Sequence, residues 1–228
     1  MQIDKDFIET LVITFKLAFL TTSILLIIGI PIGYFLAYTK SKFKPIIETV
    51  IAMPLVLPPT VIGFYFLVFF SPDAYIGKFL ENIFNIKLVF TFEGLVVASI
   101  LYSLPFMVHP LQSGFSSIPK SIIEASYTLG KSKLQTLIKV LIPNTKSSII
   151  TGIVLSFAHT IGEFGVVLMV GGSIPGETKV ASIAIYEEVE ALNYKKAHLY
   201  SLVLFGISFL ILLILFYVNK KIIKADKL

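Results

Sequence analysis

Five long stretches of this sequence are almost free of charge, and each is long enough to cross a bilayer. A transmembrane helix needs about 20 mostly apolar residues. The only charged side chains within the stretches are Lys16 and Glu163. The stretches are 12–38, 49–70, 94–118, 147–170 and 199–218. We therefore expect an all-α polytopic membrane protein whose 228 residues, 1–228, form a single transmembrane domain.

A shorter apolar segment and the overall composition refine this expectation. Residues 180–186 are too few to cross alone, so five to six transmembrane helices are expected. The chain is 56% hydrophobic and 14% charged, whereas a soluble domain carries roughly 25% charged residues. It has no cysteine, which removes disulfides and thiolate metal sites. Lipid is the expected environment.

The lysines predict how the chain is oriented. Three regions, 40–48, 120–146 and 220–227, hold 12 of the 19 lysines and only three acids. The opposite side holds six lysines and ten acids. Because lysine-rich loops stay in the cytoplasm, we expect the inner membrane, a cytoplasmic C-terminus and, with five spans, an external N-terminus. A sixth crossing would reverse one end. Since the lysines flank spans, the net charge of +5 does not indicate a nucleic-acid partner.

The second stretch contains three prolines, Pro54, Pro58 and Pro59. Each removes a backbone donor, so the carbonyls of Val50, Pro54 and Leu55 are expected to lose their helical partners. Such a break is tolerated only where the segment packs against protein or lines a watery cavity. Two interpretations stay open: a kink held by packing, and a break that lines a pore.

The lysine-rich loop at 119–143 has the pattern of two helices joined by a glycine. Ser121 and Glu124 have the spacing of a capping box for the first helix. Gly130 stands where a left-handed residue ends a helix. This arrangement places a helical hairpin on the cytoplasmic side.

The second helix of that loop is expected to be amphipathic. Ser132 and Gln135 again have capping-box spacing, and Pro143 is expected to end the helix. The apolar positions at i, i+3, i+4 and i+7 are Leu134, Leu137, Ile138 and Leu141. Such a stripe must be buried against a partner or lie flat on lipid headgroups. As a further alternative, Glu124 serves only as a helix cap.

The spacing of this loop resembles the EAA loop of ABC importer permeases. Glu124-Ala125-Ser126 is followed by three residues, Gly130, nine residues, and the run 140–143, Val-Leu-Ile-Pro. The resemblance implies a type I permease fold with a cytoplasmic coupling loop at about 119–143. In that family the loop inserts into a cleft on the ATPase subunit. The implied coupling residues are Glu124, Ala125, Ser126, Gly130, Leu134, Leu137, Leu141 and Pro143.

Four other segments resemble the molybdate branch of that family. They are Pro-Leu-Val-Leu-Pro-Pro at 54–59, Leu-Pro-Phe-Met-Val at 104–108, Ile-Gly-Glu-Phe-Gly at 161–165 and Ile-Pro-Gly-Glu-Thr at 174–178. The resemblance implies molybdate transport by alternating access in a homodimer. It also implies two ABC ATPase subunits that hold ATP and Mg²⁺, and an extracytoplasmic oxyanion-binding protein. This chain itself would bind no cofactor and be no enzyme. The alternatives are sulfate, thiosulfate or tungstate as cargo, and a stand-alone secondary transporter.

The fourth stretch carries small residues every four positions. This ridge comprises Ser148, Gly152, Ser156 and Thr160, and Ala158 with Gly162 adds a second small pair. Small residues let helices approach closely, so the ridge is expected at a dimer interface, on the pore wall, or both.

Glu163 lies near the outer end of this stretch, about 24 Å along the helix from its start. An acid at membrane depth suggests function, but a carboxylate repels an anionic cargo, so we expect a structural or gating role. The alternative is an acid bonded to backbone amides beside Gly162 and Gly165. The predicted pore and gate residues are Pro54, Pro58, Pro59, Ser156, Thr160, Gly162, Glu163, Phe164 and Gly165.

Other motifs are weak. Gly130-Lys131-Ser132 lacks the first glycine of a phosphate-binding loop, and His109, His159 and His198 have no metal-ligand spacing, so no metal site is expected. Within the spans the single cation is Lys16. We therefore expect selectivity to reside in the external binding protein.

Overall fold

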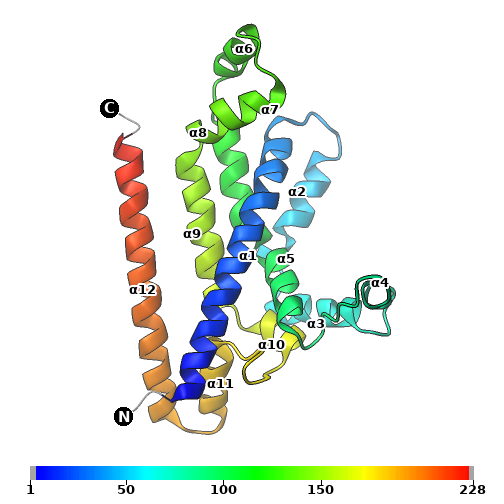
Figure 1. Cartoon of the computed structure of the whole chain (residues 1–228), viewed down its shortest axis with the longest axis vertical. Coiled ribbons are helices and arrows are strands. Elements are labelled where there is room, and N and C mark those ends of the chain that lie inside the picture. Colours follow the sequence, from blue (N-terminus) through cyan, green and yellow to red (C-terminus); the bar gives the residue numbers. More distant parts are fainter. Residues whose placement is uncertain (1–3, 226–228) are drawn as a thin grey trace.

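The computed structural model describes residues 4–225, and within that range every regular element is helical. The elements, shown in Figure 1, are α1 (Lys5–Tyr38), α2 (Lys44–Ala52), η1 (Met53–Leu55), α3 (Pro59–Phe70), α4 (Tyr75–Phe84), α5 (Phe92–Ser116), α6 (Lys120–Thr128), α7 (Lys133–Thr136), η2 (Leu137–Leu141), α8 (Ile142–Asn144), α9 (Lys146–Gly162), α10 (Gly165–Gly171), α11 (Ala181–Glu190) and α12 (Tyr194–Ala225). The predicted all-α class is confirmed.

Three of these helices, α1, α5 and α12, are each long and apolar enough to span a membrane. Two bent pairs pass the same test: α2–η1 with α3, bent by 110°, and the helical run at 133–144 with α9, bent by 75°. If each bent pair is one span, the described residues contain up to five. This agrees with the lower end of the predicted five to six helices. The segment at 180–186 lies in α11, a helix of only ten residues.

The order of crossings places the two chain ends at opposite ends of the bundle (Figure 1). The loop with α6 and α7 lies at the end where α12 finishes, whereas α4, α10 and α11 lie at the end where α1 begins. An odd number of passes gives this arrangement. It also gathers the lysine-rich segments 40–44 and 120–146 at one end.

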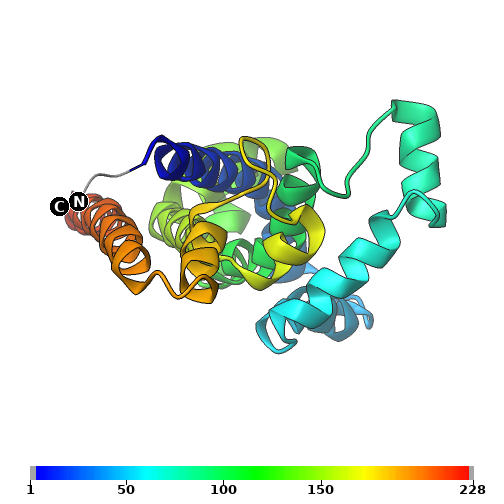
Figure 2. The ribbon, with the colours of Figure 1, turned by 90° about the horizontal axis from the view of Figure 1, so that it is seen from below.

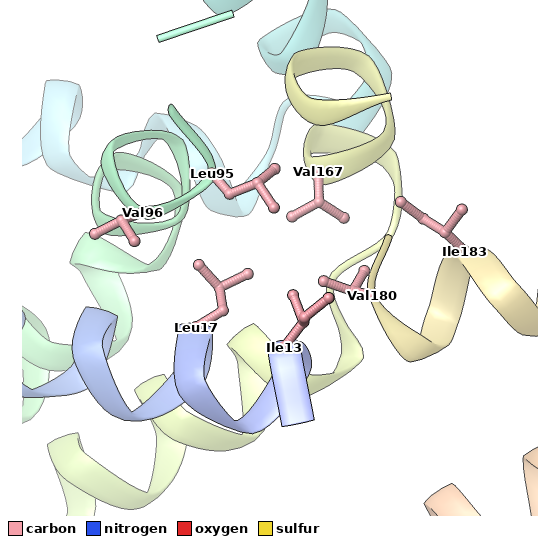
Figure 3. Packing of buried hydrophobic residues seen from close by; sticks show 7 residues of the cluster. All are labelled: Ile13, Leu17, Leu95, Val96, Val167, Val180 and Ile183. Carbon is pink, nitrogen blue, oxygen red and sulfur yellow. The ribbon is translucent and has the colours of Figure 1, made fainter. Parts of the chain in front are cut away.

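The core lies where α1 and α9 pack on α5. Gly29 and Gly33 of α1 permit this contact, since a Cβ at Gly29 would lie 2.7 Å from the Met107 side chain and one at Gly33 would lie 2.8 Å from Leu111. Figure 3 shows one buried cluster, in which α1, α5 and α10 converge with the segment that begins α11. Its members are Ile13, Leu17, Leu95, Val96, Val167, Val180 and Ile183.

α12 stands at the edge of the bundle (Figure 2), and only 6% of its most apolar window is buried. Its first turn is tied down. Lys196 Nζ lies 2.8 Å from Asp4 Oδ2 and 2.7 Å from Glu188 Oε1. Tyr200 stacks on Phe7 with ring centroids 3.7 Å apart. We call Asp4, Glu188 and Lys196 the α12 latch.

Candidate coupling loop and translocation face

The first helix of the predicted coupling loop, α6, exposes two of its three predicted coupling residues. Glu124 and Ala125 are exposed, whereas Ser126 is buried. The predicted capping box at its start is wrong: Pro119 is the N-cap, and no side chain caps the helix. Because the N-cap is Pro119, two residues before Ser121, the helix already includes Ser121. Glu124 is therefore not used as a cap.

The glycine between the two helices forms the predicted terminator. Gly130 has φ of +76°, a left-handed conformation that glycine adopts at little cost. The Gly130 amide donates to Tyr127 O at 2.9 Å and the Lys131 amide donates to Ser126 O at 3.2 Å, which is a Schellman motif. A Cβ at Gly130 would meet nothing within 4 Å, so the constraint there is the backbone angle alone.

The second capping box is confirmed. The Gln135 amide donates to Ser132 Oγ at 3.3 Å, and the Ser132 amide donates to Gln135 Oε1 at 3.0 Å. The two short helices are also joined across Gly130, because the buried hydroxyls of Ser126 and Thr136 lie 2.9 Å apart. This contact was missed. The serine in place of the family's second alanine was the signal available in the sequence.

The predicted single apolar face does not form. The helix turns into a π-helix at Leu137–Leu141, which shifts the angular spacing of the side chains. Leu137 and Leu141 therefore pack into the bundle core, whereas Leu134 and Ile138 are 64% and 53% exposed. Two of the four residues of the predicted stripe are therefore exposed apolar side chains on the coupling loop.

Pro143 does not end this helix as expected. The helical run continues one residue further, to Asn144. The break comes at Thr145, where the chain bends into α9. The Thr145 side chain donates to Leu141 O at 3.0 Å and so satisfies a carbonyl at the bend.

The proline break in the second stretch is confirmed. Pro54 lies in the 3-10 turn, Pro58 is the N-cap of α3, and Pro59 begins that helix. One detail is wrong: the Val50 carbonyl keeps a partner, because it accepts the amide of Met53. The tighter turn restores that hydrogen bond.

The small-residue ridge of α9 packs against α5 of the same chain. A Cβ at Gly152 would lie 2.9 Å from Met107 Sδ on α5. Thr160 Oγ1 lies 3.2 Å from Ser103 Oγ on α5, and Ser156 is fully buried. Ser156 and Thr160 therefore face α5, and their part in a gate stays a prediction.

The fourth predicted stretch ends earlier than expected. Helix α9 stops at Gly162 because Glu163 is extended, with φ −66° and ψ 133°. Ser99 Oγ donates to Glu163 Oε2 at 2.8 Å, and Ser182 Oγ donates to the Glu163 carbonyl at 2.7 Å. In the described residues the carboxylate bonds this serine and no backbone amide, contrary to the alternative considered above. Glu163 thus ties the break to α5 and α11.

Five of the nine predicted pore and gate residues meet around one cavity of about 460 Å³. They are Pro59, Gly162, Glu163, Phe164 and Gly165. Gly165 permits the close contact, since a Cβ there would lie 2.8 Å from Pro59. Tyr102 and His159 also line this cavity, which we call the α10-side cavity. Both were missed as site residues, although His159 stands one turn before Glu163. Pro54 instead lines a separate apolar groove with Tyr65.

The segment 174–178 forms a compact turn beside α10. The Thr178 hydroxyl donates to Gly171 O at 2.6 Å and accepts from the Ile174 amide at 3.1 Å. Gly176 has φ of +78°. Glu187 of α11 bonds both Ser173 and Lys179, which flank the turn. These bonds explain why this polar segment holds one shape.

Membrane-spanning helices, a broken span and an exposed helical loop at one end define a polytopic transport permease. Residues 29–224 match the family described as "Binding-protein-dependent transport system inner membrane component". The chain belongs to this family.

Individual relatives agree with that assignment. The chain is 45% identical to the molybdenum transport system permease protein ModB of Azotobacter vinelandii, over 95% of this chain and 96% of that one. It is 30% identical to the sulfate transport system permease protein CysT of Salmonella typhimurium, over 91% and 73% of the two chains. A bacterial ABC transporter that imports the acidic polysaccharide alginate matches in fold, with a TM-score of 0.80 at 16% identity over 96% of this chain and 80% of that one. The fold is that of ABC importer permeases.

Proposed function

We propose that this chain is the membrane-spanning permease of an ATP-driven importer of molybdate. The observation that carries the proposal is the 45% identity to a molybdenum permease along nearly the whole of both chains. The sulfate permease is matched at 30% and over less of its length. Molybdate, a tetrahedral dianion, is therefore the preferred cargo.

Two ABC ATPase subunits would dock on the coupling loop and bind the ATP and Mg²⁺; this chain would hydrolyse nothing. The support is the surface of that loop. Ala125 beside Glu124 is exposed, and so are the apolar side chains of Leu134 and Ile138. Exposed apolar groups at the tip of a polar loop favour burial against a protein partner. Closure of the ATPases would move the loop rigidly, because the Ser126–Thr136 contact joins its two helices.

The loop and the end of α12 would face the cytoplasm, with the start of α1 outside. The lysine distribution supports this orientation. A second copy of the chain would complete one pore, and an extracytoplasmic binding protein would deliver the oxyanion to it. Since Lys16 is the single cation within the predicted spans, strong selection is expected in the binding protein.

The sulfate alternative is testable by growth. A strain that lacks this chain should fail to grow on nitrate, whose reduction needs molybdenum, at low molybdate. High molybdate should restore growth and sulfate should not. Rescue by sulfate, or a growth defect corrected by a sulfur source, would contradict molybdate as the cargo.

A further inference from the structure

A second cavity lies on the same face of the bundle, between the α10-side cavity and the coupling loop. It measures about 500 Å³ and is lined by side chains from α5 and α9. We call it the loop-side cavity. Four of the α5 residues that line the two cavities recur every three or four positions and so share one helical face, with Pro105 and Pro110 beside them. The four are Tyr102 in the first cavity and Phe106, His109 and Ser113 in the second.

The α9 side follows the same rule. Ser148, Thr151 and Leu155 line the loop-side cavity, and His159 and Gly162 line the α10-side cavity. Residues three or four apart lie on one face of a helix. The two cavities are therefore consecutive along both helices. About one helical turn separates the lining residues of one cavity from those of the other.

Both cavities carry hydroxyl and imidazole groups. Thr60, Tyr102 and His159 line the first, while His109 and Ser113 line the second. No lysine lines either cavity among the described residues. Hydroxyl and imidazole groups can replace part of the water shell of an oxyanion. Without a fixed positive charge they also let the anion leave, which conduction requires.

Glu163 supplies an independent sign that the α10-side cavity holds water. The residue is only 4% exposed, and its Oε1 has no hydrogen-bond partner among the described residues. Such an unsatisfied buried oxygen is uncommon because it costs free energy. Water in the α10-side cavity can supply the missing donor to Oε1, so this cavity is expected to be hydrated.

The two cavities are separated by a pair of aromatic rings. Phe106 lines the loop-side cavity and His159 lines the α10-side cavity, and their rings stack with centroids 4.0 Å apart at 27°. His159 Nδ1 is held 2.9 Å from Ser103 Oγ, so the ring cannot rotate freely. The stacked ring faces leave no space for water between them, and narrow constrictions of this kind act as gates.

We propose that these two cavities are successive oxyanion sites on one path, and that the Phe106–His159 pair is the barrier between them. The identity of the ion rests on the proposed function, whereas the barrier rests on the geometry alone. ATP-driven motion of α5 against α9 would part the two rings, because each helix carries one of them.

The test uses the complete transporter, with its ATPase and binding protein, in sealed vesicles. Phe106→Ala should raise the leak of radiolabelled molybdate without ATP by about tenfold, equivalent to a barrier lowered by about 1.4 kcal/mol. Phe106→Leu, which keeps apolar bulk but loses the ring, should leak as well and covers the case that the alanine variant does not fold. His159→Phe keeps two stacked rings, so its leak of molybdate without ATP should stay as low as that of the parent. Phe209→Ala, which truncates a ring on the exposed side of α12, is the matched control and should not leak.

A second readout does not depend on the cargo. The chain contains no cysteine, so Thr151→Cys places a single thiol in the loop-side cavity. A membrane-impermeant thiol reagent added at the α10 end should label it about tenfold faster with Phe106→Ala than with Phe106 intact. Equal labelling and equal leak would overturn the barrier. If instead the unmodified complex fails to import molybdate with ATP, the proposed function fails, and the labelling comparison still decides the barrier.

Discussion

The buried hydroxyl pair in the coupling loop shows how one residue departs from a family pattern and gains a contact. Ser126 replaces an alanine and lies 2.9 Å from Thr136, and both residues are at most 4% exposed. The resemblance identified position 126 but not its partner. Ten residues separate the two, and only the turn at Gly130 brings them together.

Removing one member of this pair should cost more than removing both. Ser126→Ala or Thr136→Val alone leaves a buried hydroxyl without a partner, which costs about 1–3 kcal/mol. The double variant should be close to the parent. Melting temperatures of the purified transporter test this, and transport should fall together with stability in the single variants. Strictly additive losses in the double variant would contradict the coupling.

At the scale of the helical elements, local signals predicted some boundaries and missed others. The capping box at Ser132 and the glycine terminator depend on residues within one turn, and both were predicted correctly. The split of the apolar stripe depends on Leu137 and Leu141 packing into the bundle core, a tertiary contact that the sequence pattern does not contain. The π-helix accommodates that packing.

The turn at Gly130 gives a prediction for this element. Gly130→Pro should abolish ATP-driven uptake while the chain still inserts, because proline requires a negative φ and the native angle is +76°. Gly130→Asn should retain most uptake, since asparagine tolerates the left-handed region at a cost of roughly 1 kcal/mol. Co-purification of the ATPase measures docking directly. Full uptake with the proline variant would refute the docking role of the loop.

The latch at the start of α12 predicts a dependence on pH. The hydrogen bond from Lys196 lowers the pKa of Asp4, and the bond to Asp4 raises the pKa of Lys196. The contribution of Asp4 to the free energy of unfolding is therefore complete above its ordinary pKa of 3.8. It is lost as pH falls through the lowered pKa. The contribution of Lys196 to the free energy of unfolding is complete below its ordinary pKa of 10.5. It is lost only as pH rises through the raised pKa.

Lys196→Met should accordingly lower the melting temperature at about pH 7, and the difference from the parent should shrink as the pH falls through the lowered pKa of Asp4. Lys195→Met is the control, because the ion pairs of the latch use Lys196 and not its neighbour. A difference that does not change with pH would show that the latch does not hold α12 through this charge pair.

For the whole molecule, hydropathy predicted most of the architecture. The apolar stretches became α1, α5 and α12 with two bent spans, because length and charge suffice to identify a spanning helix. The early end of α9 was not predicted. Glu163 leaves the helix to bond Ser99 and Ser182, which come from distant parts of the chain. The cavities could not be predicted either, since they depend on how α5 meets α9.

The most direct measurement of the central claim is ATP-dependent uptake of radiolabelled molybdate by vesicles that contain this chain, its ATPase and its binding protein. Uptake should require all three components and should persist in excess sulfate. Uptake without the ATPase, or its abolition by equimolar sulfate, would contradict an ATP-driven molybdate permease.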